Sequence, residues 1–93
     1  MKKLYLNNLV DETYTNASGY ALYIILKGEI LTGNKVHLSF KDSKPLSSSF
    51  LNSSFGELID EIGFDEFKRI IKLVELTPPQ ADYISDYLKS VSI

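Results

Sequence analysis

The sequence predicts a small α/β domain with a mostly parallel sheet. Segments with the period of a strand alternate with segments with the period of a helix, three of each in turn. This order is typical of parallel strands joined by right-handed helical crossovers. With 93 residues, of which 44% are hydrophobic, the chain is long enough for one modest core. We therefore expect residues 1–93 to form a single α/β sandwich of three to four mostly parallel strands, with helices packed on the sheet.

The N-terminal part of the chain supplies the first strand and the first helix. Alternating side chains over Lys3–Asn7 predict a strand, and residues 9–15 fit either its continuation or a loop. The segment Asn16–Leu31 predicts a helix, with Asn16 or Ser18 as its cap and Gly33 after its end. Its expected buried stripe is Leu22, Ile25, Leu26 and Ile30.

Two further strands are expected. Residues 35–41 alternate, with Val36, Leu38 and Phe40 on one side of the strand and His37 on the other. Residues 70–76 begin with a continuous apolar run, which favours a strand in the centre of the sheet.

Two further helices follow these strands. Apolar side chains from Leu51 to Ile62 recur at helical spacing, and Gly63 supplies a stop. A short helical turn is expected over residues 64–68. The last helix is expected to open at Thr77-Pro78-Pro79, with Thr77 as its cap and proline in its first turn. Its buried stripe is expected to comprise Ala81, Ile84, Leu88 and Val91.

Composition excludes several classes of function. The net charge of −2 disfavours binding to the phosphate backbone of nucleic acids. The longest apolar run, residues 21–26, is far shorter than a membrane span. No apolar segment of the signal-peptide type follows the N-terminal lysines, which favours a cytoplasmic protein. We therefore expect neither a nucleic-acid nor a membrane partner.

The sequence contains little catalytic chemistry. It has no cysteine, no G-x-G-x-x-G or G-K-[ST] motif, and a single histidine, His37, without a second ligand at metal spacing. No nucleophile, base and orienting group can be assigned together. We expect no enzymatic activity, no cofactor and no metal site.

The most informative feature is the run Ser47-Ser48-Ser49 directly before the second helix. Serine at a helix start is commonly a simple cap. The backbone N–H groups and the dipole at such an end also favour an anion, so a serine there can act as a phosphorylation switch. Both interpretations remain open for Ser48 and Ser49.

The segment from Val36 to Gly56 resembles the STAS-like domains of unknown function, relatives of the anti-sigma factor antagonists. Val36–Phe40 occupies the family's strand, Ser47–Phe50 its serine motif, and Phe55-Gly56 the family's F-G pair. Ser39 and Ser47 stand where relatives carry aspartate, and Phe50 stands where the antagonists carry glycine. The resemblance implies a STAS-like α/β fold and a protein partner, such as an ATP-binding serine kinase of the anti-sigma type. It implies Ser49, beside Ser48, as the modified residue.

We expect the partner-binding surface to combine the serine motif with the polar residues after it. The full set is Ser47, Ser48, Ser49, Phe50, Asn52, Ser53, Glu57, Asp60 and Glu61. The run from Glu57 to Glu66 contains five acids and no base, so it is either an ordinary solvated face or an acidic face for a basic partner. An alternative function follows from the acidic face: a constitutive inhibitor or adaptor, for instance one encoded by a mobile element.

The first helix carries a second apolar edge, made of Tyr20, Tyr23, Ile24 and Leu31. A wide core face and a homodimer or partner patch explain this edge equally well.

Overall fold

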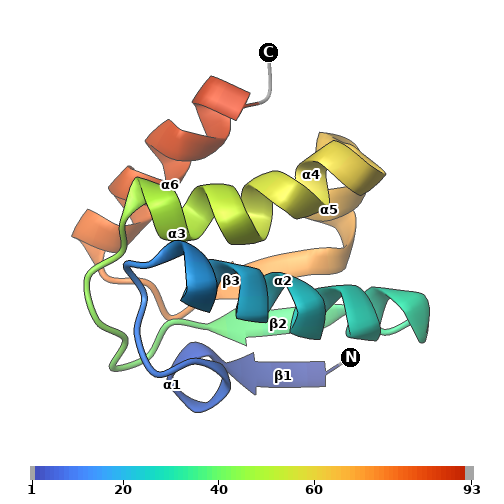
Figure 1. Cartoon of the computed structure of the whole chain (residues 1–93), viewed down its shortest axis with the longest axis horizontal. Helices are drawn as coiled ribbons and strands as arrows, with labels where there is room; N and C mark the ends of the chain where they lie inside the picture. Colours follow the sequence, from blue (N-terminus) through green and yellow to red (C-terminus); the bar gives the residue numbers. More distant parts are fainter. Residues whose placement is uncertain (1, 92–93) are drawn as a thin grey trace.

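The computed structural model describes residues 2–91 and contains a three-stranded parallel sheet (Figure 1). The strands are β1 (Lys2–Tyr5), β2 (Val36–Ser39) and β3 (Ile71–Val74), in the order β1-β2-β3. The predicted parallel α/β sandwich is confirmed. The prediction that the third strand is central is wrong, because each crossover moves to the adjacent position and leaves β3 at an edge. The apolar run at residues 70–71 does not indicate a central strand, because Ile70 is the last residue of a helix and only Ile71 belongs to the strand.

The first strand is shorter than the alternation predicted. It ends at Tyr5, and the chain turns into the single-turn helix α1 (Leu6–Leu9). Leu6 is fully buried, and the Asn7 side-chain amide donates a hydrogen bond to the carbonyl oxygen of Asp42. The turn therefore seals one end of the core instead of extending the sheet.

Helix α2 (Asn16–Leu31) has the predicted bounds. Its cap is Thr15, whose hydroxyl oxygen accepts from the Ser18 N–H at 3.1 Å, so the prediction of Asn16 or Ser18 as cap is wrong. Its buried face consists of Gly19, Leu22, Tyr23 and Leu26, whereas Ile25 and Ile30 of the predicted stripe are half-buried.

A long helical stretch follows β2 and comprises three parts: α3 (Ser48–Leu51), the π-helical turn η1 (Asn52–Gly56) and α4 (Glu57–Ile62). The residues at both junctions keep right-handed helical dihedral angles, so the stretch is continuous. Gly63, at φ 89°, ends it as predicted. The π turn was not predicted. It inserts one residue per turn, which brings both Ser54 and Phe55 into the interior.

The C-terminal part contains α5 (Phe64–Ile70), which is longer than the predicted turn, and α6 (Pro78–Val91). Thr77 caps α6 as predicted. Its hydroxyl accepts from the Gln80 N–H at 3.3 Å, and the Gln80 side chain accepts from the Thr77 N–H at 3.0 Å. Ile84 is the buried residue of α6, and the other three members of its predicted stripe are half-buried.

The core lies between the sheet and the helices on one of its faces. Side chains alternate along a strand, so Leu38 of β2 points into the core while Lys3, His37 and Lys72 of the three strands lie together on the other face. Four phenylalanines, none more than 1% exposed, fill the centre of the core: Phe40, Phe50, Phe55 and Phe67. No helix of the described residues is long and apolar enough to span a membrane.

Candidate functional site

The serine motif lies where β2 ends and the chain enters α3. The carboxyl ends of all three parallel strands face the same edge of the sheet, and in open α/β sheets ligands bind at this edge. The loop after β3 leads into α6 at the same edge, where the Gln80 amide donates to the Ser43 hydroxyl at 2.7 Å. The two loops therefore meet beside the serine motif.

A buried threonine holds the loop that leads into the motif. Thr13 is 2% exposed, and its hydroxyl donates to the carbonyl oxygen of Pro45 at 2.7 Å. The Ser47 N–H in turn donates to the Thr13 carbonyl oxygen at 3.2 Å. These bonds fix the loop and the first turn of α3 relative to the segment before α2.

Ser47 is the cap of α3, and both capacities of its hydroxyl are used. The oxygen accepts from the Phe50 N–H at 3.1 Å, and the hydroxyl donates to the Tyr14 carbonyl oxygen at 2.8 Å. The capping interpretation of the serine motif is therefore correct for Ser47, which is half-buried.

Ser48 and Ser49 are different. Both lie in the first turn of α3, both are exposed, and neither hydroxyl has a hydrogen-bond partner within the described part of the chain. Their own N–H groups precede the first intrahelical donor of the stretch, because Phe50 and Leu51 already donate to Ser47. This turn therefore presents free hydroxyls and free N–H donors to solvent.

Three residues of the expected surface occupy different environments. The side chain of Phe50 is fully buried, so its assignment to the exposed surface is corrected; as an apolar residue on the inward face of α3, it belongs to the core. Asn52 is exposed. Ser53 is half-buried and donates to the Asn16 side-chain oxygen at 3.0 Å, so it ties η1 to the start of α2.

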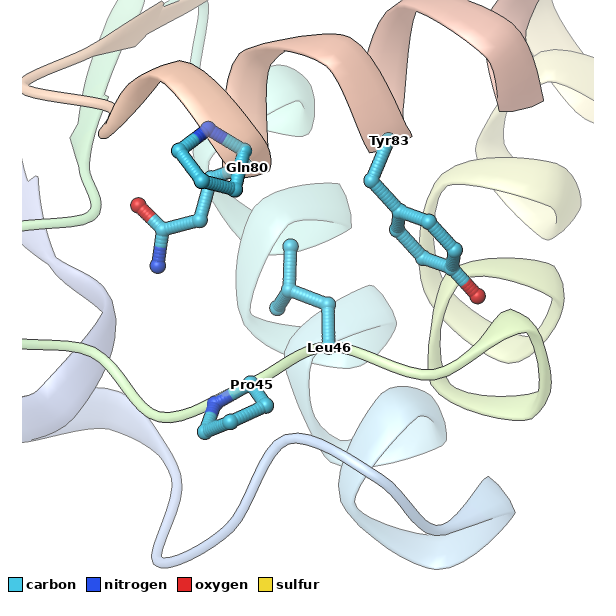
Figure 2. Close-up of a pocket in the computed structure, with 5 residues that line it drawn as sticks. Pro45, Leu46, Gln80 and Tyr83 are labelled. Atoms are coloured by element: carbon cyan, nitrogen blue, oxygen red, sulfur yellow. The ribbon is translucent and has the colours of Figure 1, made fainter.

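An apolar pocket of about 230 Å³ lies next to the motif. Its walls are Pro45 and Leu46 from the loop before α3, and Pro79, Gln80 and Tyr83 from α6. Figure 2 shows the Leu46 side chain directed from the loop toward α6, between Gln80 and Tyr83, and the Tyr83 ring pointing from α6 toward the start of α3. Tyr83 is 42% exposed, so its ring remains available for contact.

The acidic residues of α4 do not form one equivalent set. Glu57 and Asp60 are exposed and have no ion-pair partner within residues 2–91. Glu61 accepts a hydrogen bond from the Tyr23 hydroxyl and forms an ion pair with Lys27, whose Nζ lies 3.0 Å from its Oε2. Lys27 of α2 thus supplies the positive charge that the sequence from Glu57 to Glu66 lacks.

One neighbour of Asp60 is electrostatically perturbed. Burial, and then the charge of Asp60, raise the pKa of the Tyr87 hydroxyl. That hydroxyl donates to the Leu51 carbonyl oxygen at 3.3 Å, and Gly56 leaves room for it, because a Cβ there would lie 2.7 Å from the oxygen. Tyr87 is thus a protonated packing residue that fixes α6 against the π turn.

The described groups are suited to contact with a partner. The two free hydroxyls and the apolar pocket lie at the start of the helical stretch, whereas the two unpaired acids lie farther along it, in α4. No group of three potential metal ligands occurs among the described residues. Sequence reasoning missed the pocket and the Thr13 anchor. The sequence gives only a weak signal for the pocket, since Pro45 and Leu46 of one wall lie more than thirty positions before the residues of the other wall.

One comparison with known proteins identifies a family for the chain. A family model described as a STAS-like domain of unknown function matches residues 21–81, which is well over half of the chain. The chain has no significant match among curated proteins or among solved structures.

Proposed function

The chain belongs to the family of STAS-like domains of unknown function, and from this premise we propose that it is a non-catalytic protein–protein interaction module. One observation carries the proposal: the exposed pair Ser48 and Ser49 lies beside an apolar pocket at the carboxyl edge of the sheet. A partner segment can place an apolar side chain in the pocket while its polar groups bind the hydroxyls and the free N–H groups.

The proposed partner is an ATP-binding serine kinase of the anti-sigma type or a related signalling protein, and Ser49 is its proposed target. A phosphate there adds about two negative charges at the positive end of a helix, where free N–H groups can donate hydrogen bonds to the phosphate oxygens. The fold is retained because Ser47, not Ser49, makes the capping bonds. The added charge changes the surface that the partner contacts.

Site-specific cross-linking in the native cell tests the location of the surface. A photo-reactive amino acid replaces Ser49 or Tyr83 in the full chain, and the control replaces Lys72 on the opposite face of the sheet. We expect the same protein to be captured from positions 49 and 83 and not from position 72. Capture from position 72 alone contradicts the proposed surface.

A pair of substitutions tests the switch against the alternative of a constitutive inhibitor or adaptor. With the captured partner, a switch predicts that Ser49→Asp weakens binding at least about tenfold while Ser49→Ala does not. The alternative is favoured by the unpaired acids and predicts little effect of either change. It predicts instead that the double variant Glu57→Lys, Asp60→Lys loses binding.

A further inference from the structure

Helix α2 has an exposed apolar stripe that its own fold leaves uncovered. The stripe consists of Ala17, Tyr20, Ile24, Gly28 and Leu31, all exposed. Tyr20, Ile24 and Leu31 are 55%, 52% and 76% exposed, which is high for large apolar side chains. The five residues of the stripe follow one another at spacings of three and four, which places them on one narrow face of the helix, opposite the buried Leu22 and Leu26. Figure 1 shows α2 at the front of the molecule, with no other element in front of it.

The stripe carries no charge. The two charged side chains of α2 are both bound within the chain, Lys27 to Glu61 and Glu29 to Lys2, each at 3.0 Å. A surface helix normally has a polar outer face, and a helix that is apolar on all sides is normally buried. The outer face of α2 therefore has the composition of a contact surface.

We propose that this face binds the same face of a second copy of the chain, with the two α2 helices antiparallel around a two-fold axis through Ile24. The residue spacing is self-complementary about that position. In this register Ile24 meets its own copy, Tyr20 lies opposite Gly28, and Leu31 lies opposite Ala17. On either side of the Ile24 pair a large side chain thus meets a small one, and the same patch is used on both copies, as in an isologous interface.

Gly28 supports this arrangement independently. A glycine inside a helix costs about 1 kcal/mol relative to alanine, and a Cβ at Gly28 would meet no atom within 4 Å in the single chain. The fold of one copy therefore gives no reason for glycine. The proposed dimer explains the glycine, because the Tyr20 ring of the second copy packs on the backbone of Gly28, where a side chain would be in the way.

Electrostatics and area agree with a second copy as the occupant. The segment before α2 contains Asp11 and Glu12, whose charge Lys44 offsets in part, and the segment after α2 contains Lys35. An antiparallel pair therefore brings Lys35 toward a net acidic end of the other copy. The stripe exposes roughly 400–500 Å² per copy, which with its rim gives on the order of 1,000 Å² in total. That area is at the lower limit for a specific interface, so we expect a dissociation constant in the range of about 10–100 μM.

Sedimentation of the full chain between about 5 and 500 μM tests the dimer. We expect a reversible monomer–dimer equilibrium. Ile24→Glu and Ile24→Lys, which place like charges on the axis, are each expected to be monomeric throughout. An equimolar mixture of the two is expected to form dimers, because opposite charges then meet at the axis. A wild-type chain that stays monomeric, or a mixture that does not associate, overturns the proposal.

Gly28→Leu is the second variant. We expect it to weaken the dimer at least about tenfold while its circular dichroism and thermal midpoint at 5 μM show an intact fold. Unchanged association in this variant overturns the proposed register. Ser49→Asp is expected to leave association unchanged, so failure of the dimer proposal is distinguishable from failure of the proposed function.

Discussion

Neighbouring serines at the start of α3 have separate roles. Ser47 uses its hydroxyl as both donor and acceptor to join α3 to the segment before α2, whereas Ser48 and Ser49 have no such bonds within the described residues. A cap and a modifiable surface group usually compete for the same side chain. The three consecutive serines thus divide into one cap and two exposed hydroxyls, so a charge at Ser49 would leave the capping bonds of the helix start in place.

Substitution of Ser47 tests this division. We expect Ser47→Ala to lower the free energy of unfolding by about 1–2 kcal/mol, because the Phe50 N–H and the Tyr14 carbonyl oxygen both lose their partner. The matched control Ser48→Ala should change it by less than about 0.5 kcal/mol. Urea denaturation of the three chains measures the difference. Equal effects of the two substitutions would show that Ser47 is not the cap.

At the scale of elements, the close approach of α2 to α3 depends on Gly19. A Cβ at this position would lie 2.5 Å from the Phe50 carbonyl oxygen and 2.9 Å from the Ser53 Cβ. Gly19→Ala should therefore lower the free energy of unfolding by about 2 kcal/mol or more, since two backbones must separate. Gly28→Ala, measured at low concentration, should leave it unchanged or raise it, because that position is open and alanine favours a helix. Thermal denaturation in which both variants behave alike would contradict the packing of these helices.

The junction between β1, β2 and the end of β3 predicts an acid-sensitive contact. Lys3, at 2.7 Å, and then the Ser39 hydroxyl lower the pKa of Glu75. Because the folded-state pKa is below that of the unfolded chain, the contribution of Glu75 is present above the ordinary glutamate pKa and is lost as the pH falls through the folded value. Stability should therefore decline with acid below about pH 4.5.

Glu75→Gln should remove part of that decline, and Lys3→Gln should have the same effect by taking away the first partner of Glu75. The free energy of unfolding measured from pH 7 to pH 2 checks both variants. If neither substitution changes how the free energy of unfolding depends on pH, the Lys3–Glu75 contact does not contribute to the loss of stability in acid. The effect is expected to be modest because the ion pair is exposed to solvent.

At the scale of the whole molecule, the sequence predicted what local periodicity determines. The bounds of α2, the helical start at the serine motif and the parallel sheet follow from apolar spacing and turn residues near one another in the chain. The π turn, the buried Phe50 and the Lys27–Glu61 pair depend on how α2 packs on the stretch after β2. The pocket joins Leu46 to Tyr83 across the fold. Such contacts between distant segments leave no periodic signal in one sequence.

The most direct test of the account is the position of the partner on the surface. Amide chemical shifts of the isotope-labelled full chain, recorded during titration with the protein captured from position 49, locate the contact residue by residue. We expect the largest shifts at Ser48, Ser49, Leu46 and Tyr83, with little change along β1. Shifts confined to Lys3, His37 and Lys72 on the opposite face of the sheet would contradict this expectation.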